Sequence, residues 1–419
     1  MFALRISMFA SGIFLITIWA SCDNSDRSNE SVPHNTITYT NVPVGSQENL
    51  RASVNNGRKD GPSPSIPRKS NQLNDNARFL AGLKVDTASE FFEMEKNDDW
   101  KRYKSWYDVT WDRLKDRQIE NMKLWKGTQM NVNDSGATVL YPFSGADILY
   151  PNILFPIAKQ YIMIGLEPIG EIPDLSKIPL EFWENYFLAL RKAQQDLLRF
   201  SFFRTNEMIQ DFEIMELNGT LPVLLIFLAR SENQIIAVNS VSIDSDGKLW
   251  SDTSVTRLNT EAHAINGVEV TFRKANAKQG SEPQRLYYFR FNLSNRSISK
   301  RKGFEKYVKK LNSVKTIIKS ASYLMHNNHF SSVRKIILKT SNLIIQDDSG
   351  IPLSYFEETS NWKMEYFGSY SKPIKLFENH FQPNLKFHYN NEDSFEPISF
   401  KYGYGRHSNL MIARRIKKS

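Results

Sequence analysis

The chain has 419 residues, of which 41% are hydrophobic and 24% are charged. This balance is typical of a folded globular protein rather than of a disordered, collagen-like or multi-span membrane protein. Its 54 lysines and arginines exceed its 45 acidic residues, which gives a formal charge of +9. A single cysteine excludes an intramolecular disulfide and any multi-cysteine metal site.

Residues 1–21 have the pattern of a secretory signal peptide. Arg5 supplies a positive start, and residues 8–19 are apolar apart from a few small polar side chains. Ala20 and Ser21 are the small residues that a signal peptidase needs before its cut. The apolar stretch is shorter than the roughly 20 residues of a transmembrane helix.

The only cysteine, Cys22, follows directly after this segment. The sequence resembles the lipobox of bacterial lipoproteins, with Trp19 in place of the usual aliphatic residue. This relaxed form is similar to that of Bacteroidota-type lipoproteins, and Asp23 and Asp26 suit the comparison. The resemblance implies that Cys22 is lipidated and anchors the chain to a membrane of the cell envelope, on the periplasmic side or at the cell surface. The alternative is a signal cut elsewhere, with Cys22 an incidental thiol.

Residues 22–78 are rich in Ser, Asn, Asp, Gly and Pro, and they contain no Phe or Trp. Such a segment buries too little apolar surface to offset its chain entropy, so we predict a flexible, disordered tether. The globular body is predicted to occupy 79–419, with a subdivision near 215–220 where the pattern changes from helices to strands.

The body begins with a predicted aromatic helix over 86–126. Five apolar residues recur there at spacings of three and four, which places them on one face: Trp100, Tyr103, Tyr107, Trp111 and Leu114. Such a stripe could stack on sugar rings, but packing against the core is the favoured interpretation. From 137 to 170, prolines exclude a long helix. There we predict a strand over 159–166 and a short helical turn starting at Ser144 and Asp147.

The remaining elements follow from the same periodicities. Helices are predicted over 180–211 and 304–325, and strands over 222–229, 235–243, 268–273, 285–292 and, as paired or edge strands, 332–346. Helices and strands do not alternate regularly, so we predict an α+β fold with a mixed or antiparallel sheet and several amphipathic helices.

Three carboxylates at strand ends are the candidate catalytic residues. Glu167 follows the strand predicted over 159–166, and Asp347 and Asp348 follow the last apolar residues of 332–346. Carboxylates on turns held by rigid strands suit acid and base roles, as in glycoside hydrolysis. The alternative is ordinary turn chemistry, in which Asp, Ser and Gly are simply what turns require.

Standard signatures of cofactor and metal sites are missing. There is no glycine-rich phosphate loop, HExxH pair or GxSxG elbow, so no cofactor is predicted. His326 and His329 are the only close histidines, and no third ligand is identifiable, so no metal site is predicted.

A basic stretch is the candidate binding surface. Residues 296–339 hold 12 lysines and arginines and one acid, Glu305, a balance of +11. On the predicted helix, four lysines should share one exposed face: Lys302, Lys306, Lys309 and Lys310. Anionic lipid or acidic glycans are the expected partners, nucleic acid is not, and a merely solvated face is the alternative.

Together these observations predict a lipid-anchored envelope protein with a binding or structural role. The competing hypothesis is a carboxylate-dependent hydrolase of an envelope glycan or other polymer.

Overall fold

The computed structural model describes most of the predicted body. The described residues are 68–130, 132–175, 178–200, 219–252, 263–278, 280–358, 361–391, 397–404 and 408–416. The predicted signal peptide and residues 22–67 of the predicted tether lie outside this set. Within it the predicted α+β class is confirmed, because helices pack against a mixed sheet.

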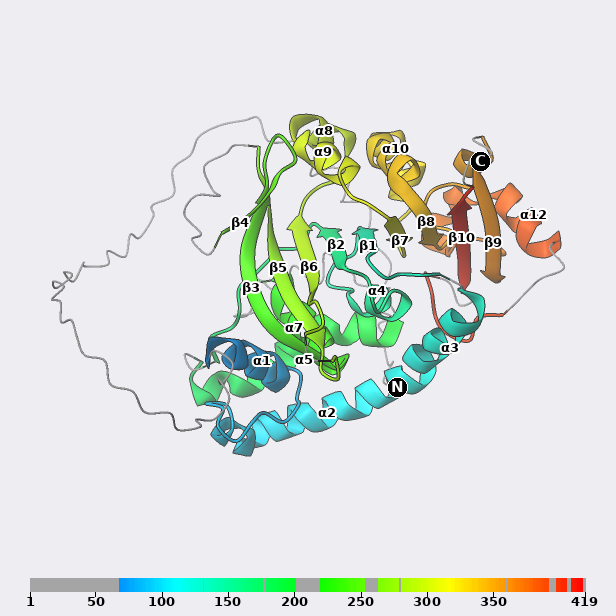
Figure 1. The fold of residues 1–419 in the computed structure, drawn as a ribbon. Coiled ribbons are helices and arrows are strands. Elements are labelled where there is room, and N and C mark those ends of the chain that lie inside the picture. The colour runs from blue at the N-terminus through cyan, green and yellow to red at the C-terminus, as the bar shows by residue number, and fades with distance from the viewer. Residues whose placement is uncertain are drawn as a thin grey trace, which may run out of the picture. The chain divides into compact units, whose positions relative to one another are not determined.

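Ten strands form this sheet, in the order β4-β3-β5-β6-β2-β1-β7-β8-β10-β9 (Figure 1). Their bounds are β1 Thr138–Pro142, β2 Gln160–Gly165, β3 Asn233–Ile243, β4 Leu249–Asp252, β5 Ile265–Lys274, β6 Gln284–Arg290, β7 Val314–Ile318, β8 Ser341–Gln346, β9 Trp362–Gly368 and β10 Asn409–Arg415. The five central strands, from β6 to β8, pair in parallel. The strands on either side of them are antiparallel to their neighbours.

The parallel strands wind in two directions from β1. Among the parallel strands, the chain forms β1, then β2 and, after the antiparallel strands β3 to β5, β6 on one side of β1. It later returns to form β7 and β8 on the other side of β1. This is a doubly wound arrangement whose direction reverses between β1 and β7. The carboxyl ends of the parallel strands therefore meet at one edge of the sheet.

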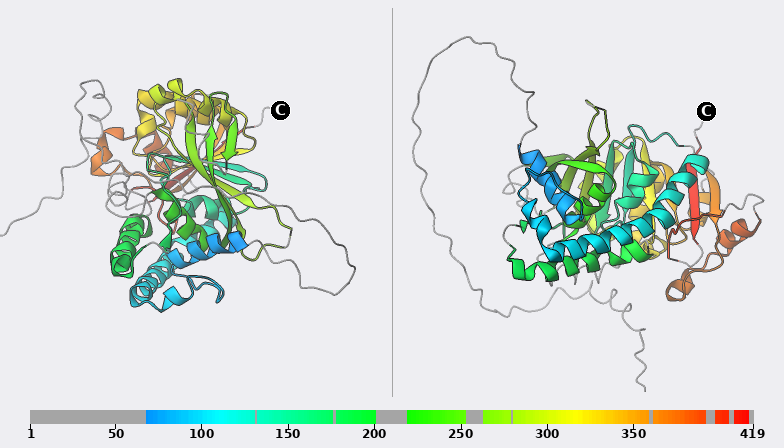
Figure 2. Two further views of the ribbon diagram at one scale, coloured as in Figure 1. Left: turned by 90° about the vertical axis from the view of Figure 1, so that its left-hand side faces the viewer. Right: turned by 90° about the horizontal axis from the view of Figure 1, so that it is seen from below.

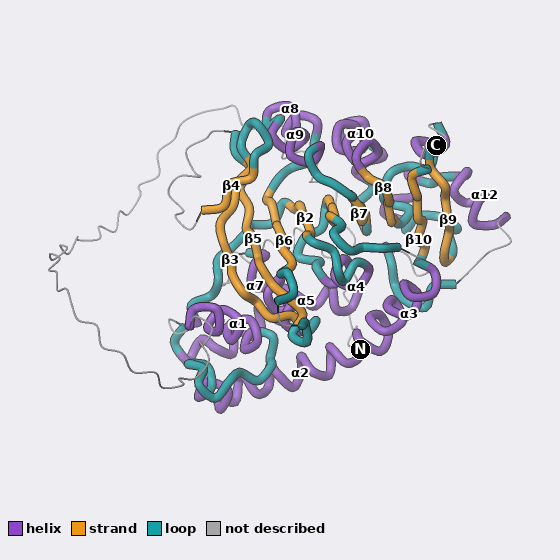
Figure 3. The backbone as a smooth tube through the Cα atoms, in the orientation of Figure 1, coloured by secondary structure: helices purple, strands orange, loops and turns teal. Residues whose placement is uncertain are grey.

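Helices cover both faces of the sheet, as Figure 3 shows by colour. One face carries α1 Arg68–Leu80, α2 Asp98–Leu114, α3 Glu120–Gln129, α4 Leu149–Leu154, α5 Trp183–Phe200 and α7 Thr220–Arg230. The other face carries α8 Asn295–Lys300, α9 Gly303–Lys309, α10 Ser331–Thr340, α11 Ser354–Glu357 and α12 Pro383–Asn391. Shorter turns are η2 Glu93–Lys96, η5 Leu180–Phe182, η7 Leu324–His326, η8 Asn328–Phe330 and η9 Lys375–His380. Alternate side chains of β1 enter the two cores, Val139 on the first face and Leu140 on the second, as the pleat requires.

The predicted aromatic stripe packs against the core, which was the favoured interpretation. All five of its residues are buried on α2, which begins at an N-cap, Asn97, whose side chain accepts from the amides of Asp99 and Trp100. Figure 2 shows α2 beside α5, and the ring of Tyr103 stacks on Phe187 of α5 with centroids 4.7 Å apart. The helix continues through a π-helical turn, η3 Lys115–Ile119, into α3.

Several predicted strands are confirmed, at 159–166, 235–243, 268–273 and 285–292. The prediction of a strand over 222–229 is wrong, because these residues lie in α7, which is buried along its whole length. A continuous apolar run gives no period with which to tell a buried helix from a buried strand. Pro222 is tolerated because it lies in the first turn, where its missing N–H has no helical partner to lose.

The prediction of one helix over 304–325 is also wrong. The helix α9 ends at Lys309, Ser313 takes a left-handed conformation with φ of 50°, and β7 follows at once. The β-branched residues of β7 favour a strand, although Val314 and Ile318 are also four apart, as on a helix face. The predicted strand pair over 332–346 is half wrong, because its first part is α10 and its second part is β8.

The folded body begins before residue 79. The side-chain amide of Asn76 in α1 is buried and donates to the Pro173 carbonyl at 2.9 Å, so the last residues of the predicted tether are packed. The predicted subdivision near 215–220 and the end of the helix predicted over 180–211 fall largely on 201–218, outside the described residues. The helices α5 and α7 on either side share one core.

Candidate functional site

The turns that follow the parallel strands gather at one edge of the sheet. They are 143–147 after β1, 166–167 after β2, 319–323 after β7 and 347–350 after β8. We call these four turns the carboxyl edge. In a doubly wound sheet, ligands bind in the crevice outside this edge, at the point where the winding reverses.

A buried ion pair lies at the reversal between β1 and β7. The ammonium of Lys319 is 2.7 Å from Oδ2 of Asp147, and both side chains are almost completely buried. The hydroxyl of Tyr141 donates to the same carboxylate, and the Lys319 ammonium lies 3.5 Å from the centroid of the Tyr150 ring. Burial lowers the pKa of Lys319, and the nearby Asp147 opposes that shift.

Asp147 precedes a short helix, α4, which begins at Leu149. The turn predicted to start at Ser144 is not helical, since Gly145 is left-handed with φ of 52°. Oδ1 of Asp147 accepts from the Tyr150 amide at 3.3 Å, at the start of α4, and the Asp147 amide donates to the Ser144 carbonyl. The carboxylate is thus bound by a backbone N–H at the start of α4 as well as by Lys319 and Tyr141.

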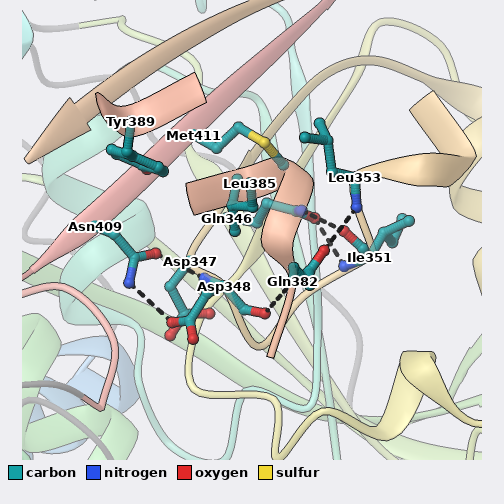
Figure 4. Close-up of a pocket in the computed structure, with 10 residues that line it drawn as sticks. All are labelled: Gln346, Asp347, Asp348, Ile351, Leu353, Gln382, Leu385, Tyr389, Asn409 and Met411. Atoms are coloured by element: carbon teal, nitrogen blue, oxygen red, sulfur yellow. Dashed lines mark hydrogen bonds between the residues drawn. The ribbon is translucent and has the colours of Figure 1, made fainter. Parts of the chain in front are cut away.

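Asp347 and Asp348 are brought together after β8 (Figure 4). Oδ1 of Asp347 accepts from the Ser349 hydroxyl at 2.6 Å, and its Oδ2 accepts from the Ser320 amide at 3.1 Å. Burial, and then the charge of Asp348, raise the pKa of Asp347 to about 7. Burial likewise raises the pKa of Asp348, against its hydrogen bond from Tyr323. The pair therefore holds a proton close to neutral pH.

The second carboxylate of the pair is fixed by side chains from other elements. The Asn409 amide donates to Oδ1 of Asp348 at 2.8 Å, and the Tyr323 hydroxyl donates a short hydrogen bond to Oδ2. Figure 4 shows both acids at one end of a small pocket, where Gln382 donates to the Asp348 carbonyl. The side chain of Gln346 lies in the wall of the pocket and narrows it. It donates to the Ile351 carbonyl and accepts from the Ile351 amide.

The turn after β7 is conformationally strained. Ser320, Ser322 and Tyr323 all have positive φ, between 51° and 55°, which costs roughly 1 kcal/mol or more for each non-glycine residue. Bonds from the β8 turn hold it, including one from the Ala321 amide to the Ser349 hydroxyl at 2.8 Å. Strain of this kind at the carboxyl edge marks the turn as a candidate functional segment.

Glu167 lies on the same edge but apart from the aspartates. It is buried after β2, and the Tyr288 hydroxyl donates to its Oε2 at 3.1 Å. Gly165 makes this possible, because a Cβ there would lie 2.3 Å from that oxygen. Three strand spacings separate Glu167 from Asp347, or about 14 Å at roughly 4.8 Å per strand. The structure therefore brings two of the three predicted acids together and leaves the third across the edge.

The predicted basic face differs from its expected form. Lys302 caps the short helix α9 and Lys310 follows it, so the four lysines do not share one long helix. The Lys306 ammonium is 2.9 Å from Oδ1 of Asp246, and the Lys310 ammonium donates to the Asp246 carbonyl at 2.9 Å.

Other cations of the +11 stretch are also neutralised or buried. Lys309 is 2.6 Å from Glu305, one turn earlier on α9. Lys315, Lys319 and Arg334 are buried and do not contribute an exposed charge. The surface of this stretch is therefore less positive than its composition indicates.

The two histidines, His326 and His329, lie in two successive short turns. His326 packs its ring against Tyr323 and His380, with centroids 5.1 Å away in both cases, and burial lowers its pKa to about 4. His329 is the middle residue of the next turn, η8. Among the described residues, no group of three His, Cys, Asp or Glu side chains is arranged to hold a metal ion.

Sequence reasoning missed Asp147, Lys319 and Tyr323 as parts of the site. Lys319 directly follows five residues of mostly β-branched side chains, a pattern that favours a strand ending just before Lys319. The mistaken helix over 304–325 hid that pattern, because it placed Lys319 on a solvated face.

No helix in the described part of the chain combines the length and the apolar character needed to span a bilayer. No family model, curated protein or solved structure matches the chain.

Proposed function

We propose that the folded body binds a nucleoside-like ligand, neutral or cationic and rich in hydroxyls, at the carboxyl edge. The observation that carries this proposal is the winding of the parallel strands, which reverses beside Asp147 and Lys319. Doubly wound sheets bind mononucleotide and dinucleotide ligands at such a reversal. Glu167 supports the ribose part, because it follows β2 about 20 residues after Gly145 of the first turn, where an acidic side chain accepts from ribose hydroxyls.

The charge of the edge selects against phosphates. Four buried acids gather there, Asp147, Glu167, Asp347 and Asp348, against one buried ammonium, that of Lys319, so the acids outnumber the cation even with a proton on the Asp347–Asp348 pair. The first turn has the single glycine Gly145 rather than a glycine-rich loop, and the Tyr150 amide at the start of α4 already donates to the Asp147 carboxylate. Anions are therefore repelled, whereas hydroxyl donors and cations find acceptors.

Binding of adenosine, guanosine, cytidine and uridine to the purified full-length protein tests this proposal, by calorimetry in detergent with ATP as the anionic comparison. We expect at least one nucleoside to bind more tightly than ATP. Glu167→Gln should weaken that binding about tenfold, since it removes a charged acceptor. Glu171→Gln, an exposed acid in the same segment, should leave it unchanged. Absence of binding by all four nucleosides would contradict the proposal.

In this proposal the body is held at the cell envelope by a lipid on Cys22. The support is the position of the only thiol, directly after the signal-like segment. Cys22→Ser should abolish incorporation of radiolabelled fatty acid into the expressed protein, whereas incorporation into both forms would contradict lipidation.

A hydrolase of an envelope glycan remains the second candidate, with Glu167, Asp347 and Asp348 as its acids. The pKa of Asp347, raised to about 7, favours the hydrolase, because a general acid works best when its pKa lies near the ambient pH. The position of Glu167 does not, since the strands before Glu167 and Asp347 lie three strand spacings apart, about 14 Å, whereas opposed carboxylates in inverting glycosidases lie about 6.5–9.5 Å apart. Release of reducing ends from peptidoglycan, lost in Asp347→Asn, would favour the hydrolase over the binding protein.

A further inference from the structure

Residues 397–404 lie against the carboxyl edge. The backbone at Gly403 is so close to Asp347 that a Cβ there would lie 2.4 Å from Oδ2. The Tyr404 hydroxyl donates to the Ser320 carbonyl at 2.5 Å, and the Tyr402 hydroxyl donates to the Ile345 carbonyl at 3.4 Å. The segment thus occupies space outside β7 and β8, next to the reversal of the winding.

A π-helical turn, η3, between α2 and α3 holds this segment. Gln118 of η3 accepts from the Lys401 amide through Oε1 and donates to the Lys401 carbonyl through Nε2 at 3.2 Å. The Tyr150 hydroxyl donates to the same carbonyl at 2.8 Å. Both backbone polar groups of Lys401 are therefore bound by side chains.

Gln118 and Tyr150, the two side chains that bind the Lys401 backbone, are called the clasp. The location of the clasp links the segment to the site. Tyr150, which bonds Lys401, also lies over the Lys319 ammonium, and its ring is 6.0 Å from that of Tyr402. π-helical turns inside α-helices often occur at functional positions, because the extra residue redirects side chains. Here the turn carries Gln118, whose side chain binds both backbone polar groups of Lys401.

We propose that residues 397–404 are a cover over the carboxyl-edge site, and that Gln118 is the positioning residue that keeps it closed. The inference rests on the proposed function, since it concerns access to the same site. A ligand outside β7 and β8 competes with the cover for space. Its apparent affinity is then reduced by the fraction of molecules in which the cover is open.

The test uses the full-length protein and two variants that loosen the clasp, Gln118→Ala and Tyr150→Phe. The second keeps the aromatic ring over Lys319 and removes only the hydroxyl. The control is Asn121→Ala, one turn further along, whose exposed side chain donates only to carbonyls of the π-helical region. Two measurements need no ligand: acetylation of Lys319 by acetic anhydride, followed by mass spectrometry, and hydrogen exchange of the Lys401 amide.

Both clasp variants should acetylate Lys319 and exchange the Lys401 amide about fivefold to tenfold faster than wild type, as loss of one or two hydrogen bonds implies. The control should match wild type. The nucleosides should bind the clasp variants more tightly, because less of the protein is closed.

Unchanged acetylation in both clasp variants overturns the cover, whatever the nucleosides do. Faster acetylation with unchanged or weaker nucleoside binding overturns the competition between cover and ligand. If no form binds a nucleoside, the proposed function fails, while the two ligand-free measurements still decide whether Gln118 holds the segment closed over Lys319.

Discussion

The two ends of the carboxyl edge place the same functional group in different surroundings. At the β2 end, Glu167 accepts a hydrogen bond from one buried hydroxyl, that of Tyr288. At the β8 end, Asp347 and Asp348 share a buried pocket, and burial together with their mutual repulsion raises the pKa of Asp347 to about 7. The two ends therefore differ in what surrounds the acid: Glu167 has one buried hydroxyl donor, whereas Asp347 lies beside a second buried carboxylate whose charge adds to the effect of burial in raising its pKa.

The largest effect should come from the ion pair between the two ends. Lys319→Met leaves the buried carboxylate of Asp147 without its partner and should lower the free energy of unfolding by about 3–5 kcal/mol. The double variant Asp147→Asn with Lys319→Met should recover much of this loss, because no buried charge remains. Denaturant unfolding measures both. Equal losses in the single and double variants would show that the charge itself is unimportant.

The second-largest effect should be a pH dependence of stability that comes from the β8 end. The pKa of Asp347 rises from 3.8 to about 7 on folding, so the folded state binds more protons than the unfolded state between these values. Stability from this group is present at low pH and is lost as pH rises towards 7, by about 2 kcal/mol between pH 5 and 7.

A comparison with Asp347→Asn isolates this effect. His326, whose folded pKa is lowered to about 4, contributes with the opposite sign, since stability rises with pH as its unfolded form loses a proton. That contribution is common to both proteins and cancels in the difference. Parallel stability profiles for wild type and Asp347→Asn would show that the acid does not take up the proton.

Removing one hydroxyl at each end sharpens the comparison further. Tyr323→Phe takes the donor from Asp348, and Tyr288→Phe takes the donor from Glu167, and both tyrosines are buried. We expect a loss of about 2 kcal/mol for Tyr323→Phe and about 1 kcal/mol for Tyr288→Phe, because the coupled pair depends more on each donor. Thermal unfolding under matched conditions gives the difference, and a larger loss for Tyr288→Phe would reverse the assignment.

The smallest effect should come from the basic residues outside this edge. Lys306 and Lys309 are already paired with Asp246 and Glu305, so their reversal to Glu should weaken binding to anionic vesicles by only about twofold at low salt. Reversal of the exposed Lys302 alone is the matched comparison. Complete loss of vesicle binding in the double variant would restore the basic face as the main binding surface.

Part of the site could be read from the sequence because local rules govern it. Glu167, Asp347 and Asp348 were placed on turns after strands, and the structure has them there. Asp347 and Asp348 are neighbours in the sequence, so their proximity could be read. The donors that fix them could not, because Ser320, Tyr323 and Asn409 come from other elements. Lys319 and Gln118 were missed for the same reason, since their partners Asp147 and Lys401 are remote in sequence.

The sequence by itself determined the elements whose periodicity is strong. The buried stripe of α2 follows from apolar residues at spacings of three and four, and β3, β5 and β6 follow from β-branched and aromatic runs bounded by turns. Only the tertiary structure decided that 222–229 is a helix and 314–318 a strand, because a segment buried on all sides shows no polar face to reveal its period. It also decided the order of the strands, and with it which turns meet at the carboxyl edge, because strand neighbours are set by long-range packing.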